Sequence, residues 1–478
     1  MDATHSQSLK VTDLPPEIHH EIFSHFKDAR MGRPGRVDWH WNENYDDLPA
    51  KRHAIANSRL TCRLFHQLAT PMLLPTVRVK LEQPSLDRLD EISRIPAVAG
   101  SVRGLEIILA YRPKEIATDI RGLVVTKMKD VMRERDPDPF GNVMEMVQAW
   151  VDYAGDPTVD TTGDEHKTLL RESFAEYQRL HAEQDGLISS GAFVDGIAAA
   201  VARMPLFGSI LFNDEDVYAG HPKREEREES EEPDPPPPLH LSLTAAEKWA
   251  AVEAMESLEA RRAPLPPARI LSDLPVAIHA AGATLREIGV NCFPMTGGAE
   301  GTGAIRNLDA LRAACQQLEE VVFWPLADPR RTYVAEARGQ ITGYLSALLS
   351  GRSLETLSVR VAGITKGYGP VGPALGGLDG TRLRTACIEQ AQLTQAEWDG
   401  FCAGIGGQLR ELTLANMRLA EGEWEPSMGV LRGKMLDGAE GGDLELMLLR
   451  LSGGGFGDGE HIRAITWSAY DKIDKRVA

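Results

Sequence analysis

The chain has 478 residues, of which 42% are hydrophobic, and a formal net charge of -18 at pH 7. This length is too great for one ordinary compact core, so it predicts two or more domains or a repeat architecture. The negative charge argues against binding nucleic acid or an anionic membrane surface through bulk electrostatics, and a protein partner is favoured.

Five cysteines are widely spaced along the chain, and no two of them form a Cys-x-x-Cys pair. This pattern predicts reduced thiols in a cytoplasmic or nuclear protein. The first ten residues are polar, and no apolar run approaches the roughly eighteen residues that span a bilayer. We therefore expect an intracellular protein that does not cross a membrane.

Two amphipathic helical segments are predicted near the start of the chain. A helix is expected to begin at Pro16, which suits a first helical position, and Glu17 follows where the helix dipole favours an acid. The apolar residues recur every four positions, first at Ile18, Ile22 and Phe26 and again at Leu60, Leu64 and Leu68. Because one short helix cannot bury such a stripe alone, we expect the two stripes to pack together.

These segments resemble a known family. The phrases that carry the resemblance are Leu14-Pro15-Pro16-Glu17-Ile18, Ile22-Phe23 and Arg59-Leu60-Thr61-Cys62-Arg63-Leu64-Phe65. In this order they are similar to the F-box of fungal-type F-box proteins, a small helical module that docks onto the Skp adaptor of cullin-RING ubiquitin ligases. The module is assigned to residues 1–75. It departs from the family in a polar insertion over residues 27–54, where F-boxes usually have a short link.

The resemblance implies a partner and a set of contact residues. The partner is the Skp adaptor and, through it, a cullin ubiquitin ligase. The implied adaptor-binding residues are Leu14, Pro15, Ile18, Ile22, Phe23, Leu60, Cys62 and Phe65. The alternative is a plain helical hairpin that caps the domain behind it.

Residues 76–213 are predicted to form the first α/β repeats, interrupted by a helical insertion. A helix is expected over 85–95, and helical periodicity returns over 115–204. The predicted strands lie at 76–81, 102–107 and 207–212.

An acidic, proline-rich stretch follows at residues 214–244. Such a composition cannot bury enough apolar surface to offset the entropy of ordering, so we predict a disordered linker. It separates the first α/β repeats from a second region, residues 245–478.

A strand phrase recurs along the chain. It consists of an apolar residue, two variable residues, an apolar residue, one variable residue and another apolar residue. The clear copies are Phe207/Ile210/Phe212, Leu285/Ile288/Val290, Leu318/Val321/Phe323, Leu354/Leu357/Val359, Leu409/Leu412/Leu414 and Leu446/Leu449/Leu451, and a weaker copy is Leu383/Ala386/Ile388. A helix is expected after one of these strands, where Thr394 and Glu397 have the spacing of a capping box.

The phrase resembles the strand of leucine-rich repeats, in which each unit adds one strand to a curved parallel sheet. Its spacing is irregular, and the asparagine or cysteine of standard repeats is missing from the ninth position. The predicted fold class is therefore α/β, with a small N-terminal all-α F-box-like module followed by an irregular leucine-rich-repeat-like α/β solenoid. A doubly wound α/β domain is the alternative.

The variable positions of the phrase are expected on the concave, solvent-facing side of the sheet, where a target protein would bind. The possible target-facing residues are Arg286, Glu287, Glu319, Glu320, Glu355, Thr356, Arg410, Glu411 and Thr413. Polar residues must occupy such places in any soluble repeat protein, so hydration of the surface is the alternative role.

Two sequences resemble catalytic or cofactor motifs and fail in detail. In His20-Glu21-Ile22-Phe23-Ser24-His25 the second histidine comes one position too late for the zinc protease motif, which turns the two rings about 140° apart on a helix. Residues 367–372 have the glycine spacing of a dinucleotide loop, but Pro370 and Pro373 oppose a helix there. No catalytic, cofactor-binding or metal-binding residue is predicted, and an enzyme is the least favoured class.

The sequence leads to two main hypotheses. In the first, which follows from the resemblance, the protein is the substrate-recognition subunit of a Skp-cullin-F-box (SCF) type ubiquitin ligase and binds a target through its repeats. In the second, the protein is a leucine-rich-repeat interaction scaffold outside any ligase, and its N-terminal helices cap the repeats.

Overall fold

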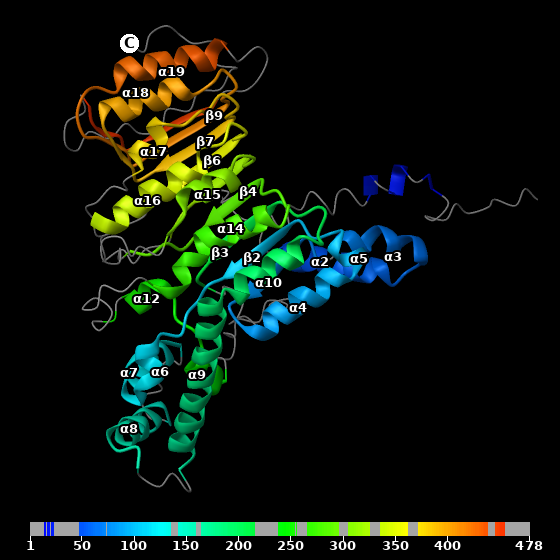
Figure 1. Ribbon diagram of the computed structural model, residues 1–478, viewed down its shortest axis with the longest axis vertical. Helices are drawn as coiled ribbons and strands as arrows, with labels where there is room; N and C mark the ends of the chain where they lie inside the picture. Colours follow the sequence, from blue (N-terminus) through cyan, green and yellow to red (C-terminus); the bar gives the residue numbers. More distant parts are fainter. Residues whose placement is uncertain are drawn as a thin grey trace, which may run out of the picture.

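The computed structural model describes residues 14–15, 17–19, 21–22, 47–72, 74–134, 142–158, 164–215, 238–253, 255, 265–295, 305–325, 335–361, 371–437 and 445–454. Within this part the chain is an α/β structure built on a single nine-stranded parallel sheet (Figure 1). The strands are β1 (Thr76–Lys80), β2 (Gly104–Ile108), β3 (Ser209–Asn213), β4 (Glu287–Val290), β5 (Glu320–Phe323), β6 (Thr356–Arg360), β7 (Thr385–Glu389), β9 (Glu411–Ala415) and β11 (Glu445–Leu449). They lie side by side in chain order.

The predicted fold class is wrong. An all-α N-terminal module followed by a separate solenoid is not what forms, because one sheet runs through the described chain from β1 to β11. Its first strand starts at Thr76, directly after the 3-10 turn η2 (Thr70–Met72). The pairing of β3 with β4 also carries the sheet across the interval that contains the predicted linker. The strand phrases mark where strands form, but they do not show where one sheet ends.

One face of the sheet is covered by a layer of helices that follow one another in chain order (Figure 1). The layer consists of α4 (Gln83–Arg94), α10 (Ala192–Val201), α14 (Ile270–Ala280), α15 (Leu308–Ala314), α16 (Ala335–Leu348), α17 (Gly372–Gly376), α18 (Gln395–Gly404) and α19 (Glu425–Asp437). The middle apolar residues of the strand phrases, such as Ile288, Val321 and Leu357, are buried beneath it. Because side chains alternate along a strand, the residues between them lie on the opposite face, which we call the polar face.

A helical lobe is inserted in the chain between the paired strands β2 and β3 and extends away from the sheet (Figure 1). Its helices are α6 (Lys114–Thr118), α7 (Ile120–Glu134), α8 (Asn142–Gly155) and α9 (Glu165–Ser190), joined by α11 (Leu239–Thr244) from the far side of β3. They enclose a second core, in which Trp150, Tyr177 and Leu243 are buried. The last six residues of the predicted linker thus form α11, whereas 216–237 lie outside the described residues.

Shorter elements complete the described chain. They are α2 (Asp47–Arg59) and α3 (Arg63–Ala69) before the sheet, α5 (Pro96–Ala99), α12 (Trp249–Glu253), η4 (Pro266–Arg269), and a small parallel sheet of β8 (Gln392–Leu393), β10 (Arg418–Leu419) and β12 (Ser452–Gly453). The start of α2 at Asp47 places the end of the predicted insertion 27–54 in a helix.

A left-handed residue follows each of the last three strands of the nine-stranded sheet. Gln390, Asn416 and Arg450 come directly after β7, β9 and β11, and their φ angles are 53°, 51° and 52°. This shared turn redirects the chain from the main sheet toward the small sheet. No helix in the described part of the chain is long and apolar enough to cross a membrane.

Candidate protein-binding surfaces

The helices α2 and α3 have a small core of their own. Ile55, Ala69 and Met72 are buried, with Phe65 and Leu68 packed against them, and this cluster is separate from the core beneath the sheet. Cys62 begins α3, where its Sγ accepts a hydrogen bond from the backbone N–H of Phe65 at 3.4 Å. The N-terminal helices therefore fold around their own apolar contacts.

The helical residues 17–19 and 21–22 contact this small core through a histidine, which the sequence pattern did not predict. The backbone N–H groups of Ile18 and His19 donate to the Pro15 carbonyl, which closes the first turn. His19 is buried, and its ring centre lies 6.1 Å from that of Phe65 in an edge-to-face contact. Ile18 and Ile22 are 45% and 41% exposed, so the predicted packing of their stripe against the second helix is wrong.

The predicted adaptor-binding residues fall into two groups. Pro15, Ile18, Ile22 and Leu60 are exposed, and Leu60 is 85% exposed in the turn between α2 and α3. The half-buried group consists of Leu14, Cys62 and Phe65. Phe23 lies outside the described residues. The residues of the exposed group leave apolar surface uncovered on the N-terminal helices.

Five of the predicted target-facing residues belong to the strands themselves. Glu287, Glu320 and Thr356 are direct neighbours in one row across β4, β5 and β6, and Glu411 continues the row on β9 beyond Thr385. Thr413 lies in the next row of the same face. Glu320 is only 6% exposed, which contradicts its predicted role as a surface contact. Glu411 is exposed, and the other three are half-buried.

The other four predicted residues, Arg286, Glu319, Glu355 and Arg410, lie just before their strands. Arg286 and Glu319 form an ion pair at 2.8 Å, and Glu355 pairs with Arg382 at 2.8 Å. The guanidinium of Arg410 donates to the carbonyl groups of two residues in its own turn. Exposed ion pairs of this kind contribute roughly 0–1 kcal/mol, so they add little to the stability of the edge.

Sequence reasoning missed a cluster at the other end of the same face. The Arg360 guanidinium lies 4.9 Å from the ring centre of Trp324, and its Nε is 3.6 Å from the Glu389 carboxylate. Burial raises the pKa of Glu389, and the positive charge of Arg360 acts against this shift. Trp324 is only 7% exposed and Glu389 only 3%, so the half-buried Arg360 is the part of this cluster that reaches the solvent. In the sequence, Trp324 and Arg360 each come directly after the last apolar residue of a strand phrase, and this position is the signal that could have located them.

A buried ionic cluster joins the helical lobe to the sheet. Lys127 of α7 pairs with Glu247, and its Nζ also donates to the Ala245 carbonyl at 2.7 Å. Arg112, just beyond β2, donates to the Thr244 carbonyl at 2.9 Å and lies 3.3 Å from the Glu82 carboxylate. The Lys127 and Glu247 side chains are almost fully enclosed, so a substrate would not reach them. This cluster fixes the lobe in place.

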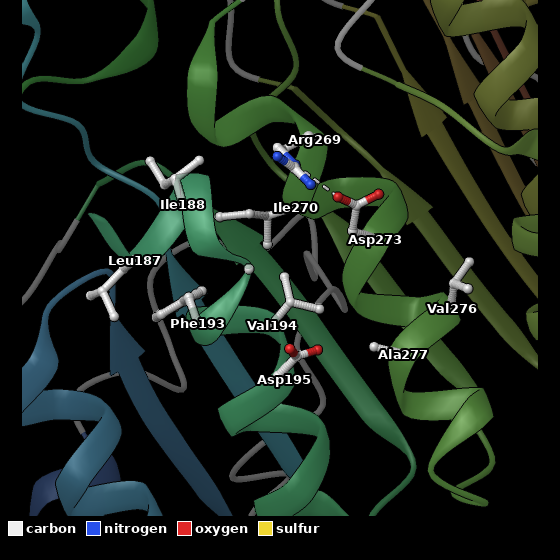
Figure 2. Close-up of a pocket in the computed structure, with 11 residues that line it drawn as sticks. Leu187, Ile188, Phe193, Val194, Asp195, Arg269, Ile270, Asp273, Val276 and Ala277 are labelled. Atoms are coloured by element: carbon white, nitrogen blue, oxygen red, sulfur yellow. Dashed lines mark hydrogen bonds and ion pairs between the residues drawn. The ribbon is translucent and has the colours of Figure 1, made fainter. Parts of the chain in front are cut away.

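A cavity of about 360 Å³ lies between the end of α9, the start of α10 and α14. Val194, Val276 and Ala277 form an apolar floor, and Asp195 stands at the rim across from an Arg269–Asp273 ion pair (Figure 2). Among the described residues, no group of three or more His, Cys, Asp or Glu side chains is arranged to hold a metal ion.

Comparison with known proteins does not identify a family. No family model matches the chain. No curated protein matches it either.

Proposed function

We propose that the protein is a non-catalytic receptor, in which the N-terminal helices bind the Skp adaptor of an SCF-type ubiquitin ligase and the sheet binds a target protein. The observation that carries this proposal is the exposure of Ile18, Ile22 and Leu60. Burial of a fully exposed side chain of this kind contributes roughly 1.5–3 kcal/mol, so the 85% exposed Leu60 would gain most of this amount and the half-covered Ile18 and Ile22 about half of it each. A partner with a matching apolar groove would remove them from water.

The separate core of α2 and α3 favours docking over capping. A cap would share its buried residues with the core that it closes. Here Ile55, Ala69 and Met72 form a cluster apart from the core beneath the sheet. The N-terminal helices can thus present their apolar residues outward without opening the body of the protein.

The polar face supports the second half of the proposal. It offers Glu411 and Thr413 on β9, and the half-buried Arg360 at the end of β6 adds a positive charge held in place by the buried Trp324. Holding the target beside the ligase raises its effective concentration near the ubiquitin-carrying enzyme, and no chemistry by this chain is required. All five cysteines are free, in keeping with a cytoplasmic or nuclear site of action.

An adaptor pull-down with the full chain tests the proposal. Ile18→Asp combined with Ile22→Asp should reduce the affinity for the adaptor about tenfold or more, since two lost contacts of roughly 0.7 kcal/mol each amount to one factor of ten. Val430→Asp is the matched control, because Val430 is 53% exposed on α19, far along the chain from these helices.

The double variant should keep the folded signal of the wild type and lose the adaptor. Leu14→Ala combined with Pro15→Ala should weaken binding in the same direction. Equal recovery of adaptor by the wild type and the double aspartate variant, or no recovery by either, would reject the proposal.

An interaction scaffold outside any ligase is the second candidate. It is favoured by the contact of η2 with α5, which lies between the first two strands of the sheet. Deleting residues 1–75 separates the two candidates. The scaffold with its cap removed should aggregate, whereas a chain that has lost only a docking segment should stay monomeric and folded by size-exclusion chromatography and circular dichroism.

A further inference from the structure

The cavity between α9, α10 and α14 exists because the chain reverses sharply there. Gly191 has a φ of 77°, ends α9 and begins α10. This left-handed backbone is cheap only for glycine, and no side chain projects from it. The turn directs α10 against α14 while α9 leaves toward the lobe, and the space of about 360 Å³ lies where the three helices part.

The interior of the cavity is apolar and already in place. Val194, Val276 and Ala277 are half-buried and line the space, and Val194 and Val276 pack against the main core. Their positions are therefore held by packing on the side away from the cavity. The volume is near the lower end of the roughly 300–1,000 Å³ that small-molecule sites occupy, which suits a compact apolar group.

The rim carries an excess negative charge. The Arg269 Nε and the Asp273 carboxylate are 2.9 Å apart and largely neutralise each other. Asp195 lies across the cavity from this pair, and within the described residues its carboxylate takes part in no hydrogen bond or ion pair (Figure 2). An ammonium group at the rim would gain a counter-ion, and a carboxylate would be repelled.

We propose that this cavity binds a small organic cation, namely a primary ammonium group carried on a compact alkyl or cycloalkyl body. The body occupies the apolar floor between α10 and α14, and the ammonium group lies beside Asp195. This site is on the helical side of the sheet, so the inference does not depend on adaptor binding or on the polar face.

Titration of the full chain with three matched probes tests the site. Cyclohexylmethylammonium, cyclohexylmethanol and cyclohexanecarboxylate share one apolar body and differ in charge. In ligand-observed NMR we expect the ammonium probe to bind about fivefold more tightly than the alcohol, which is the range of an ion pair open to water, and the carboxylate to bind weakest.

Two variants locate the binding. Asp195→Asn should remove the preference for the ammonium probe over the alcohol, and Ala277→Phe should fill the cavity and abolish binding of both. Asp309→Asn, an exposed aspartate on α15, is the control that should change nothing. Thermal unfolding of each variant verifies that it is folded.

Three results would overturn the proposal. They are no saturation by the ammonium probe, equal preference in wild type and Asp195→Asn, or unchanged binding in a folded Ala277→Phe variant. Binding of a lysine-containing peptide at Asp195 without binding of the ammonium probe would also count against it, because the occupant would then be a protein segment.

Discussion

The nine-stranded sheet and its helices, which we call the body, bury their apolar surface almost completely. The N-terminal helices do not. The body buries one continuous core that extends from Val77 on the first strand to Leu451 after the last. The N-terminal helices bury three apolar residues and leave Leu60 almost entirely in water. The difference indicates that the body is complete by itself, while the N-terminal helices keep apolar surface for something else to cover.

The deepest part of the body should be the most sensitive to substitution. Phe323 is fully buried, and its ring centre lies 5.5 Å from Phe293 and 6.2 Å from Tyr344. Phe323→Ala should lower the free energy of unfolding by about 3–5 kcal/mol, because it removes apolar contacts and leaves a cavity. Urea unfolding monitored by circular dichroism measures this change. Val430→Ala, at an exposed position, should stay within about 0.5 kcal/mol of wild type. A loss below 1 kcal/mol for Phe323→Ala would show that the core is less tightly packed than its burial implies.

A buried carboxylate makes the stability of the body depend on pH. Burial raises the pKa of Asp214 to about 6, even though its carboxylate accepts a hydrogen bond from the Trp249 backbone N–H at 2.8 Å. Its pKa in the unfolded chain is near 3.8, so the folded state binds the proton more tightly. Stability is therefore lost as the pH rises from about 4 to 6, and the shift of two units corresponds to about 3 kcal/mol.

Asp214→Asn separates this effect from the rest of the body. The amide keeps an oxygen for Trp249 and has no charge to bury. Above pH 6 the variant should be more stable than wild type by up to about 3 kcal/mol, and the difference should vanish near pH 4. Denaturant unfolding at a series of pH values measures it. A difference that is the same at pH 4 and pH 7 would mean that Asp214 does not titrate in this window.

Substitutions in the N-terminal helices should change stability less than those in the body, and a buried and an exposed position there should differ clearly. Ile55→Ala should lower their local stability by about 2 kcal/mol, at the low end for buried isoleucine because the cluster is small. Leu60→Ser should change it by less than about 0.5 kcal/mol, since Leu60 makes few contacts to lose. Hydrogen exchange of the α2 and α3 amides measures both. If Ile55→Ala lowered the unfolding temperature of the whole protein instead, the two regions would be one cooperative unit.

Local patterns in the sequence predict individual elements well. The capping box at the start of α18 is confirmed, because the Thr394 hydroxyl accepts from the Glu397 N–H at 3.3 Å and the Glu397 carboxylate accepts from the Thr394 N–H at 2.8 Å. All three residues of the copy at Leu285/Ile288/Val290 are also buried, and Ile288 and Val290 lie in a strand, as predicted. Each of these signals lies within a few residues, where propensity and periodicity act.

Features that depend on distant pairing were not predictable in the same way. The single sheet requires β2 to pair with β3 across the whole helical lobe, and the Lys127–Glu247 pair joins residues 120 positions apart. At the candidate docking surface, the four-residue spacing of Ile18 and Ile22 predicts a shared helix face. The spacing does not show whether that face is buried or exposed, and it does not predict that His19 is the buried residue.

The left-handed residues after β7, β9 and β11 have a consequence for how such a chain can lengthen. Gln390 and Asn416 have nearly the same φ and follow strands held in matching register. A second copy of residues 390–415 spliced after Ala415 would meet compatible backbone at both joins. Tandem duplication, in nature or by engineering, could then extend the molecule by one strand and one helix at a time without rebuilding its neighbours.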